Sequence, residues 1–460
     1  MGTVNLVIVG QGAAGLSAAV SAAEEARRRG VALNVTVLEK APEAEAGGNT
    51  RWSPSYMRMA SPERVEPGFV HDMLEATGFQ GDEGYFARLA ADAPATVAWI
   101  RTQGVEFHQP TYYLAKGPPR IQPVGGGPAI VETLTGAAKR LGVAIRYSSP
   151  ARALVFEDNR IRGVELDDGI APADAVVLAS GGFQANAEMM REHFGAGADG
   201  IRLISPGTRF ATGDGIRMAL AAGADRSGDW TGMHIEPVDP RSKNSAPVVL
   251  VYPYGVVVDQ SGQRFFNEGG GLVHETWEEF SRILHFGVAG REAYAILDRK
   301  LYDIADWQRA VRSEVPPFEA PTLRGLAAKI GVNADALIET VASYNASADG
   351  DASQFDPTRC DGLVATRELS PPKSNWTRPI ADPPFLAYPL IGAIAYTFGG
   401  VATDDRARVL RSGEPVPGLY AAGEITGHFY GTAPNAVSVL RSFVFGRRAG
   451  LEAVEYLGNS

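Results

Sequence analysis

Two patterns of apolar residues alternate along the chain. Short continuous runs predict strands, and longer stretches with a helical period predict helices. An apolar run at residues 4–9 predicts a buried strand, and an Ala-rich stretch that ends near Arg29 predicts a helix. A second apolar run at 35–38 predicts another strand, which ends on Glu39. A strand, a glycine turn, a helix and a strand in this order form a βαβ unit.

The rest of the chain continues the mixed pattern. Apolar runs within 176–179 and 416–424 predict further buried strands, and 248–259 reads as a strand that turns at 260–263. Helices are expected in the segments 61–110, 211–223, 278–286, 289–303, 323–345 and 436–450. Prolines between 371 and 384 break the pattern and mark a linker. Because 460 residues exceed one compact core, we expect an α/β protein of two domains.

The glycines between the first strand and the first helix have a spacing that suits a bound pyrophosphate. Gly10 permits the tight turn, Gly12 lets the backbone approach the phosphates, and Gly15 lets the helix pack on the strand. The N-terminus of the helix offers free N–H groups and a partial positive charge. Glu39 stands where it can accept hydrogen bonds from a ribose. The sequence therefore predicts a dinucleotide site; the alternative is a set of glycines that serve only the turn.

Composition and charge narrow the classes of function. The formal net charge is −10, which argues against nucleic acid as a partner. The chain has no apolar run of about 18 residues, so we expect no membrane span. It begins without a basic leader and has a single cysteine, Cys360, so we expect a cytoplasmic protein. Scattered histidines and the lack of a GxSxG elbow argue against a metal site and a hydrolase.

The segment 416–424 ends on a Gly-Glu pair, and the helix predicted at 436–450 follows it. With the glycine turn and the loop 47–52, this arrangement resembles the flavoprotein family of fumarate reductases, succinate dehydrogenases, 3-ketosteroid dehydrogenases and tricarballylate dehydrogenase. The resemblance implies a Rossmann-type FAD-binding domain whose final helix points its N-terminus at the flavin. The loop 47–52 contains no histidine, so we expect non-covalent FAD. The residues expected to bind FAD are Gly10, Gly12, Ala14, Gly15, Glu39, Lys40, Gly47, Gly48, Asn49, Thr50, Ala179, Asp214, Gly423, Glu424, Ser438 and Val439.

In this family a smaller cap domain interrupts the FAD-binding domain. Residues 229–237 look like the exit from the FAD-binding domain, and the prolines at 371–384 look like the return. We therefore expect a discontinuous FAD-binding domain at 1–239 and 376–460, and an α+β cap domain at 240–375. The substrate is expected in the cleft between the two domains, against the flavin.

The family's chemistry removes two hydrogens from a C–C bond beside a carbonyl or carboxylate, with a hydride passing to the flavin and a proton to a base. Succinate and fumarate enzymes of the family grip two carboxylates with two histidines and two arginines. His234 matches the first histidine, but Tyr396 stands near the second position and the segment 430–435 holds no arginine. A bidentate arginine is not replaced by Tyr or Asn without loss. We therefore expect that the protein is not a fumarate reductase.

Tyrosines populate the expected cleft instead, and in ketosteroid dehydrogenases a tyrosine takes the proton. The cleft candidates are Tyr252, Tyr254, Tyr396 and Tyr430, with Tyr112 and Tyr113. The alternative for each tyrosine is an ordinary structural residue at the interface between the domains. The alternative for Arg264 is a structural ion pair with Glu268 instead of a role toward the substrate. Arg120 and Arg209 could meet one carboxylate, and His274 or His428 could relay a proton. The residues expected to be catalytic are Tyr396, Tyr430, Tyr254, Arg264 and His274, with the first two as leading proton acceptors.

The expected function is FAD-dependent desaturation of the bond α,β to a carbonyl. The expected small-molecule substrate is a cyclic ketone or keto acid, of the ketosteroid or 4-oxocyclohexanecarboxylate type. The alternatives are a polycarboxylate dehydrogenase like tricarballylate dehydrogenase, an enoate reductase like fumarate reductase, and a flavin-binding redox sensor. The sequence points to no particular electron acceptor.

Overall fold

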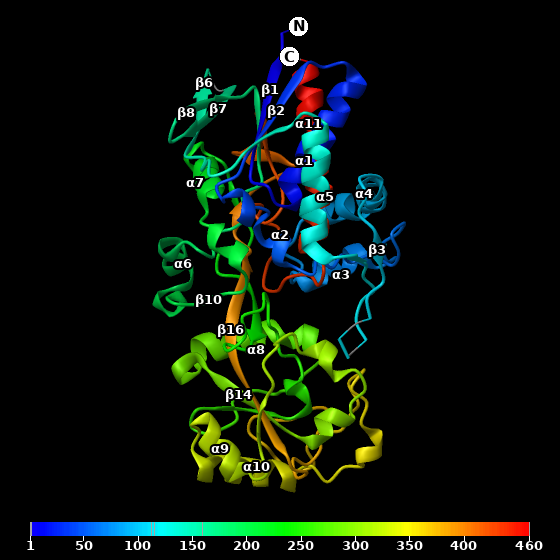
Figure 1. Cartoon of the computed structure of the whole chain (residues 1–460), viewed down its shortest axis with the longest axis vertical. Helices are drawn as coiled ribbons and strands as arrows, with labels where there is room; N and C mark the ends of the chain where they lie inside the picture. The colour runs from blue at the N-terminus through cyan, green and yellow to red at the C-terminus, as the bar shows by residue number, and fades with distance from the viewer. Residues whose placement is uncertain (1, 112, 115, 159, 460) are drawn as a thin grey trace.

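The computed structural model describes residues 2–111, 113–114, 116–158 and 160–459. Figure 1 shows an elongated molecule with two lobes, and both chain termini lie at the end of the larger one. The larger lobe is built on a six-stranded sheet with the order β18-β19-β9-β1-β2-β5, in which only the β18–β19 pairing is antiparallel. Its strands are β1 (Val4–Val9), β2 (Leu33–Leu38), β5 (Ala144–Arg146), β9 (Ala175–Leu178), β18 (Arg408–Arg411) and β19 (Glu414–Ala421).

Three helices cover one face of this sheet: α1 (Ala13–Arg29), α5 (Gly126–Arg140) and α11 (Ser438–Gly458). Helices α1 and α11 approach closely because α11 presents glycines to α1. A Cβ on Gly446 would lie 2.3 Å from the carbonyl oxygen of Ala14, and one on Gly450 would lie 2.4 Å from that of Ala18. Only glycine permits such backbone contact. The packing brings the N-termini of α1 and α11 to the same end of the sheet.

The larger lobe contains further helices, a small three-stranded sheet and two short strand pairs. They are α2 (Gly48–Trp52), α3 (Phe69–Ala76), α4 (Glu83–Thr102), α6 (Ala187–Phe194), α7 (Asp214–Ala221), the three-stranded sheet β6 (Ala153–Glu157), β7 (Arg160–Leu166) and β8 (Gly169–Pro172), and the short pairs β3 (Phe107–His108) with β4 (Gln122–Pro123) and β11 (Arg226–Ser227) with β17 (Gly400–Val401).

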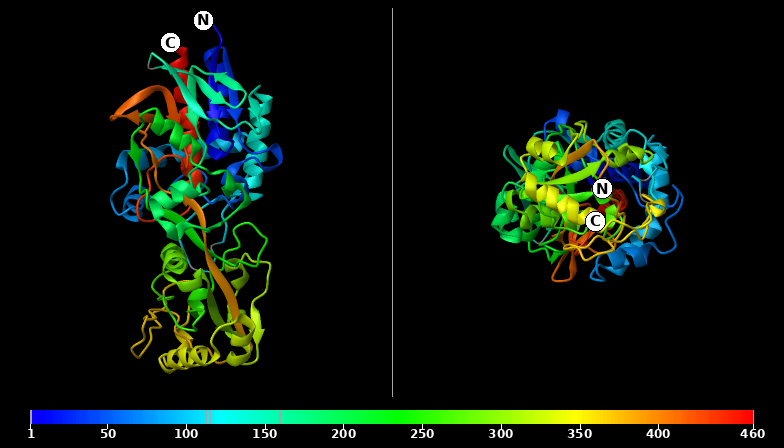
Figure 2. Two further views of the ribbon diagram at one scale, coloured as in Figure 1. Left: turned by 90° about the vertical axis from the view of Figure 1, so that its left-hand side faces the viewer. Right: turned by 90° about the horizontal axis from the view of Figure 1, so that it is seen from below.

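The smaller lobe, the cap domain, combines a second sheet with helices (Figure 2). Strand β16 (Phe385–Thr397) is its axis: residues 385–390 pair with β14 (Ala293–Asp298), and residues 391–397 pair with β12 (Met233–Val238). The first part of β16 therefore belongs to the cap sheet and the second part to the larger lobe. The remaining elements of the cap domain are β13 (Val256–Asp259), β15 (Phe318–Ala320), α8 (Val273–Gly287), α9 (Leu323–Ile330) and α10 (Ala334–Ala346). Strand β10 (Arg202–Leu203) pairs with the second part of β16 and lies in the larger lobe.

The fold confirms the expected class, an α/β domain with an inserted α+β cap. The domain boundaries stay a prediction, and the pairings of β16 favour a return near residue 390 over one at 376. The helix expected at 289–303 is wrong, because Ala293–Asp298 forms the buried strand β14. The single helix expected at 323–345 is two helices, since Gly331 adopts a left-handed φ of 72° and ends the first one. Among the described residues, no helix has the length and apolarity needed to cross a membrane.

Candidate active site

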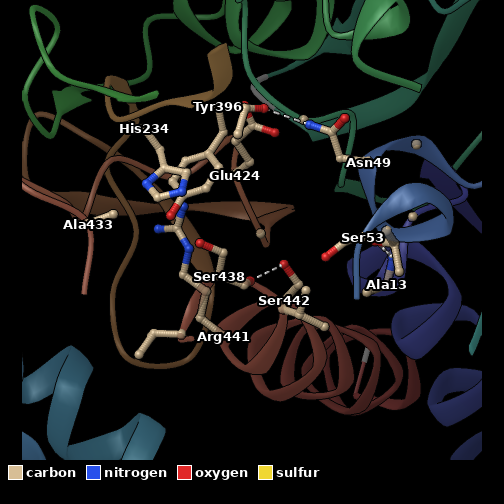
Figure 3. A pocket seen from close by; sticks show the side chains of 18 of the residues that line it. Ala13, Asn49, Ser53, His234, Tyr396, Glu424, Ala433, Ser438, Arg441 and Ser442 are labelled. Carbon is tan, nitrogen blue, oxygen red and sulfur yellow. Dashed lines mark hydrogen bonds between the residues drawn. The ribbon is translucent and has the colours of Figure 1, made fainter. Parts of the chain in front are cut away.

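A cavity of about 700 Å³ lies where the end of the main sheet meets the cap domain. It is lined by the glycine turn, the loop after β2, the start of α11 and several side chains of the cap domain. Its volume falls within the range of about 300–1,000 Å³ typical of ligand and cofactor sites. Figure 3 shows residues from α11, β12 and β16 arranged around the open space.

The glycine turn has the geometry that the sequence predicts. Gly10 adopts a φ of 106°, and a Cβ there would lie 2.4 Å from the carbonyl oxygen of Ala179. A Cβ on Gly15 would lie 1.9 Å from the carbonyl oxygen of Gly10, so α1 is packed directly against the turn. Gly12 is different, because the nearest atom to its Cβ would be the Thr50 hydroxyl at 3.6 Å. Gly12 therefore leaves its backbone open to the cavity.

The residues predicted to bind FAD gather around this cavity, and all of them line it except Gly15 and Gly47. Glu39 is buried and accepts hydrogen bonds from the backbone N–H groups of Gln11 (2.9 Å) and Ala41 (2.7 Å). Burial raises the pKa of its carboxyl group, although these two hydrogen bonds lower it. Glu39 thus orders the glycine turn from the end of β2, and it lines the cavity.

Lys40 and Asp214 form an ion pair with 2.7 Å between Nζ and Oδ2 at the edge of the cavity. Asn49 is held by three partners: its side-chain N–H₂ donates to the Ala395 carbonyl, and its oxygen accepts from Ser205 and Thr208. These contacts fix the loop after β2 against the larger lobe.

Several buried groups on the cavity wall fit a bound FAD. The Ser180 hydroxyl and the side-chain oxygen of Gln11 are buried and have no hydrogen-bond partner among the described residues. Helix α11 begins at Ser438 beside the cavity, so its N-terminal N–H groups can stabilise a negative charge. Burial raises the pKa of Glu424 to about 7, although the Thr397 N–H and Arg441 oppose this shift. A carboxyl group that carries a proton near neutral pH can donate a hydrogen bond to a ligand oxygen.

A second set of residues forms the part of the cavity next to the cap domain. His234, on β12, lies between two carboxylates: Nε2 is 2.9 Å from Glu236 Oε1, and Nδ1 contacts Glu278 Oε1. Since each ring nitrogen faces a carboxylate, both carry a proton and the ring is an imidazolium. Burial alone would lower the pKa of His234, but the Tyr396 oxygen, Glu278 and Glu236 raise it well above the ordinary value.

Tyr396, on β16, stacks on this ring, with 4.7 Å between ring centres and 16° between planes. Burial raises the pKa of Tyr396 despite the charge on His234, so its hydroxyl keeps its proton at neutral pH. Figure 3 shows His234, Tyr396 and Glu424 close to the start of α11. The tyrosine therefore brings a hydrogen-bond donor to the end of the cavity where the flavin is expected.

Two of the five residues expected to be catalytic line the cavity, namely Tyr396 and His274. Burial and the charges of Arg120 and Arg58 lower the pKa of His274 to about 4, so it is neutral at pH 7. His428 or His274 was expected to relay a proton for the catalytic tyrosine, but the histidine against the Tyr396 ring is His234.

The other three expected catalytic residues lie outside the lining of the cavity. Tyr254 is buried in the cap domain and donates to the Pro357 carbonyl. The Tyr430 hydroxyl accepts from the Gly228 N–H at 3.1 Å. Arg264 is 2.6 Å from Glu268 and almost completely buried, which is the ion pair that the sequence offered as an alternative.

Other side chains considered from the sequence also have local partners. His428 is buried between Thr403 and the ring of Tyr85, and burial lowers its pKa to about 3. Arg209 pairs with Glu45. Tyr252 lies in the core of the cap domain, and Tyr112 falls outside the described residues.

The prediction missed Glu236, Glu278 and Arg312, which all line the cavity. The sequence contains a signal for Glu236, because it stands two residues after His234 on a strand, and residues two apart on a strand point to the same face. Arg312 had none, because it follows a 3₁₀ turn in an irregular part of the cap domain.

Comparisons with known proteins identify relatives of this chain among flavoproteins. Over 99% of its length the chain is 27% identical to "Probable fumarate reductase Ifc3" of Shewanella frigidimarina, of which it covers 75%. It is 29% identical to 4-oxocyclohexanecarboxylate 2-dehydrogenase of Sinomonas cyclohexanicum, over 67% of this chain and 57% of that one. Its fold matches the open conformation of a flavocytochrome c3 fumarate reductase with a TM-score of 0.77 and 26% identity, covering 99% of this chain and 78% of that chain.

The fold and the site define a flavoprotein oxidoreductase that uses FAD. The chain belongs to the FAD binding domain family, whose model matches residues 5–438. The resemblance drawn from the sequence is therefore confirmed, and so is the cofactor.

Proposed function

We propose that this enzyme desaturates the bond α,β to the carbonyl of a cyclic ketone or keto acid. The observation that carries the proposal is the charge at His234. Two carboxylates flank its imidazolium, so the group of three carries a net negative charge. A carboxylate of the substrate would be repelled there, whereas a neutral carbonyl would be accepted.

Tyr396 suits the binding of such a carbonyl. Its protonated hydroxyl can donate to the carbonyl oxygen and stabilise the enolate that forms when a base takes the α-proton. His274, neutral at pH 7 in the cavity wall, is the candidate for that base. The sequence suggested a tyrosine as proton acceptor, but the raised pKa of Tyr396 favours a donor instead. Bound FAD would supply the hydride acceptor at the start of α11. The cap-domain residue Trp277, 6.1 Å from the His234 ring, adds an apolar wall for a ring-shaped substrate.

A dehydrogenase for polycarboxylates is the second candidate. It is favoured by the arginines at the cavity wall, which include Arg58, Arg120 and Arg312. Arg58, however, is already paired with Asp72 and Glu66. A redox sensor without a substrate is disfavoured because the cavity extends past the residues expected to bind FAD to cap-domain residues such as Trp277 and Arg312. We also propose that FAD is bound non-covalently and that the protein works in the cytoplasm.

The test is anaerobic reduction of the bound flavin by candidate substrates, followed by its absorbance near 450 nm. We expect bleaching by 4-oxocyclohexanecarboxylate or by a 3-ketosteroid, and none by succinate or tricarballylate. The variant Tyr396→Phe should keep FAD but lose about 100–1,000-fold in the bleaching rate, the usual loss for one oxyanion donor. Bleaching by tricarballylate alone would establish the second candidate. Tyr85→Phe is a matched control, because that hydroxyl lies in the core of the larger lobe.

A further inference from the structure

Two arginines, one from each domain, meet the same pair of tyrosine rings in the cavity. We infer that Arg120 and Arg312 bind a carboxylate of the substrate, which makes the substrate a keto acid rather than a neutral ketone. The inference rests on the proposed function for the reaction but makes a separate claim about binding. It assigns a role in specificity to residues outside the His234 and Tyr396 group.

Arg120 is a cavity residue with only 4% of its surface exposed. Its Cζ lies 3.9 Å from the centre of the Tyr56 ring and 4.9 Å from that of Tyr113. Both Arg120 and Tyr56 stand next to a backbone bridge, in which Met57 and Ile121 exchange two N–H···O hydrogen bonds of 2.9 Å. The guanidinium is therefore held in position before any ligand arrives.

Arg312 reaches the same rings from the cap domain. It donates to the Tyr56 hydroxyl at 3.2 Å, and its Cζ lies 5.8 Å from the Tyr56 ring and 5.7 Å from the Tyr113 ring. Its backbone N–H is anchored on the Val248 carbonyl. Two like charges around one pair of rings repel each other, and a carboxylate that accepts from both guanidinium groups would remove that repulsion.

The neighbouring charges support an anion at this place. Glu236 raises the pKa of Arg312, but the same carboxylate is bonded to His234. His274 is neutral at pH 7, and Arg58 is paired with Asp72. The wall of the cavity thus has a negative group around His234 and a positive pair at Arg120 and Arg312. A substrate with a neutral carbonyl at one end and a carboxylate at the other complements both.

The test measures binding of two unreactive ring compounds, cyclohexanecarboxylate and cyclohexanecarboxamide, to the FAD-loaded enzyme by the change in the visible flavin spectrum. We expect the wild-type protein to bind the carboxylate at least tenfold more tightly. Arg120→Gln and Arg312→Gln should each weaken carboxylate binding about 10–100-fold, the loss for charge-assisted hydrogen bonds, and change amide binding less than threefold. Arg88→Gln, which removes a surface partner of Asp405, is the matched control and should change neither.

Equal binding of the acid and the amide by the wild-type protein would overturn the inference. So would carboxylate binding that is unchanged in both variants while their FAD content equals that of the wild type. If either Gln variant fails to take up FAD, Arg120→Lys and Arg312→Lys replace it; each keeps the charge but not the fork, and we expect an intermediate loss. A preference for the acid without flavin reduction by any keto acid would instead refute the proposed function and leave the binding role standing.

Discussion

Replacing Glu278 by Gln tests the charge arrangement around His234. Glu278 is buried on α8, contacts His234 through one oxygen and accepts from the Ala433 N–H at 3.2 Å through the other. It therefore joins the cap domain to β12 and to the loop before α11. The substitution removes one charge, keeps the size and leaves a carbonyl oxygen for Ala433.

The expected loss follows from these contacts. Removing one partner of a buried ion pair costs about 3–5 kcal/mol. Glu236 still pairs with His234 in the variant, and the amide still accepts from Ala433, so we expect about 2–3 kcal/mol of unfolding free energy at pH 6.

The loss should depend on pH with a defined sign. The pKa of His234 in the folded protein lies well above its ordinary value of 6.5, so its ion-pair stabilisation is complete below pH 6.5 and is lost as the pH rises through the folded pKa. The difference between the wild-type protein and Glu278→Gln should therefore be largest near pH 6 and shrink as the pH rises through the folded-state pKa of His234.

Urea unfolding of the FAD-loaded proteins at several pH values measures this difference. The neighbouring Glu279→Gln is a matched control, because Glu279 is exposed on the same helix and its replacement should change stability by less than about 0.5 kcal/mol. The reasoning is refuted if the two variants are equally stable, or if the loss in Glu278→Gln grows as the pH rises.

Further predictions concern the cofactor, the core and the substrate. Heat or acid should release intact FAD, and flavin left on the precipitated chain would contradict non-covalent binding. Glu39→Ala should weaken FAD binding by about 1–3 kcal/mol in fluorescence titrations, because the glycine turn loses two hydrogen bonds. His428 has a pKa of about 3 in the folded protein but of about 6.5 in the unfolded chain. As the pH falls from about 6.5 to about 3, only the unfolded chain takes up this proton, so the free energy of unfolding should fall by up to about 5 kcal/mol. His428→Phe should flatten that part of the pH–stability curve. Fumarate should be turned over far below the usual 1–1,000 per second with a reduced dye, because carboxylates of Glu236 and Glu278 occupy both sides of His234.

The part of the fold that binds FAD could be predicted because its residues form local patterns. The glycine spacing, Glu39 at the end of a strand and the Gly-Glu pair before the last helix each follow from neighbours in sequence. The strand β14 was missed because Ala293–Asp298 is a short apolar run, and such a run does not distinguish a buried strand from a buried helix.

The substrate side depends on contacts between distant segments, which the sequence does not record. Glu278 meets His234 across 44 residues, and Arg312 meets Tyr56 across 256. Tyr254 and Arg264 have residue types suited to catalysis, but the packing of the cap domain gives them structural partners. For this reason His234 and Tyr396 were each singled out from the sequence, but their stacking on each other was not predicted.

The central claim is tested most directly by mixing the FAD-loaded enzyme with 4-oxocyclohexanecarboxylate without oxygen and following the flavin absorbance. The account predicts full bleaching, formation of an α,β-unsaturated keto acid, and a rate about 100–1,000-fold lower in Tyr396→Phe. An oxidised flavin after prolonged incubation with this and other cyclic ketones, together with rapid bleaching by a polycarboxylate, would contradict it.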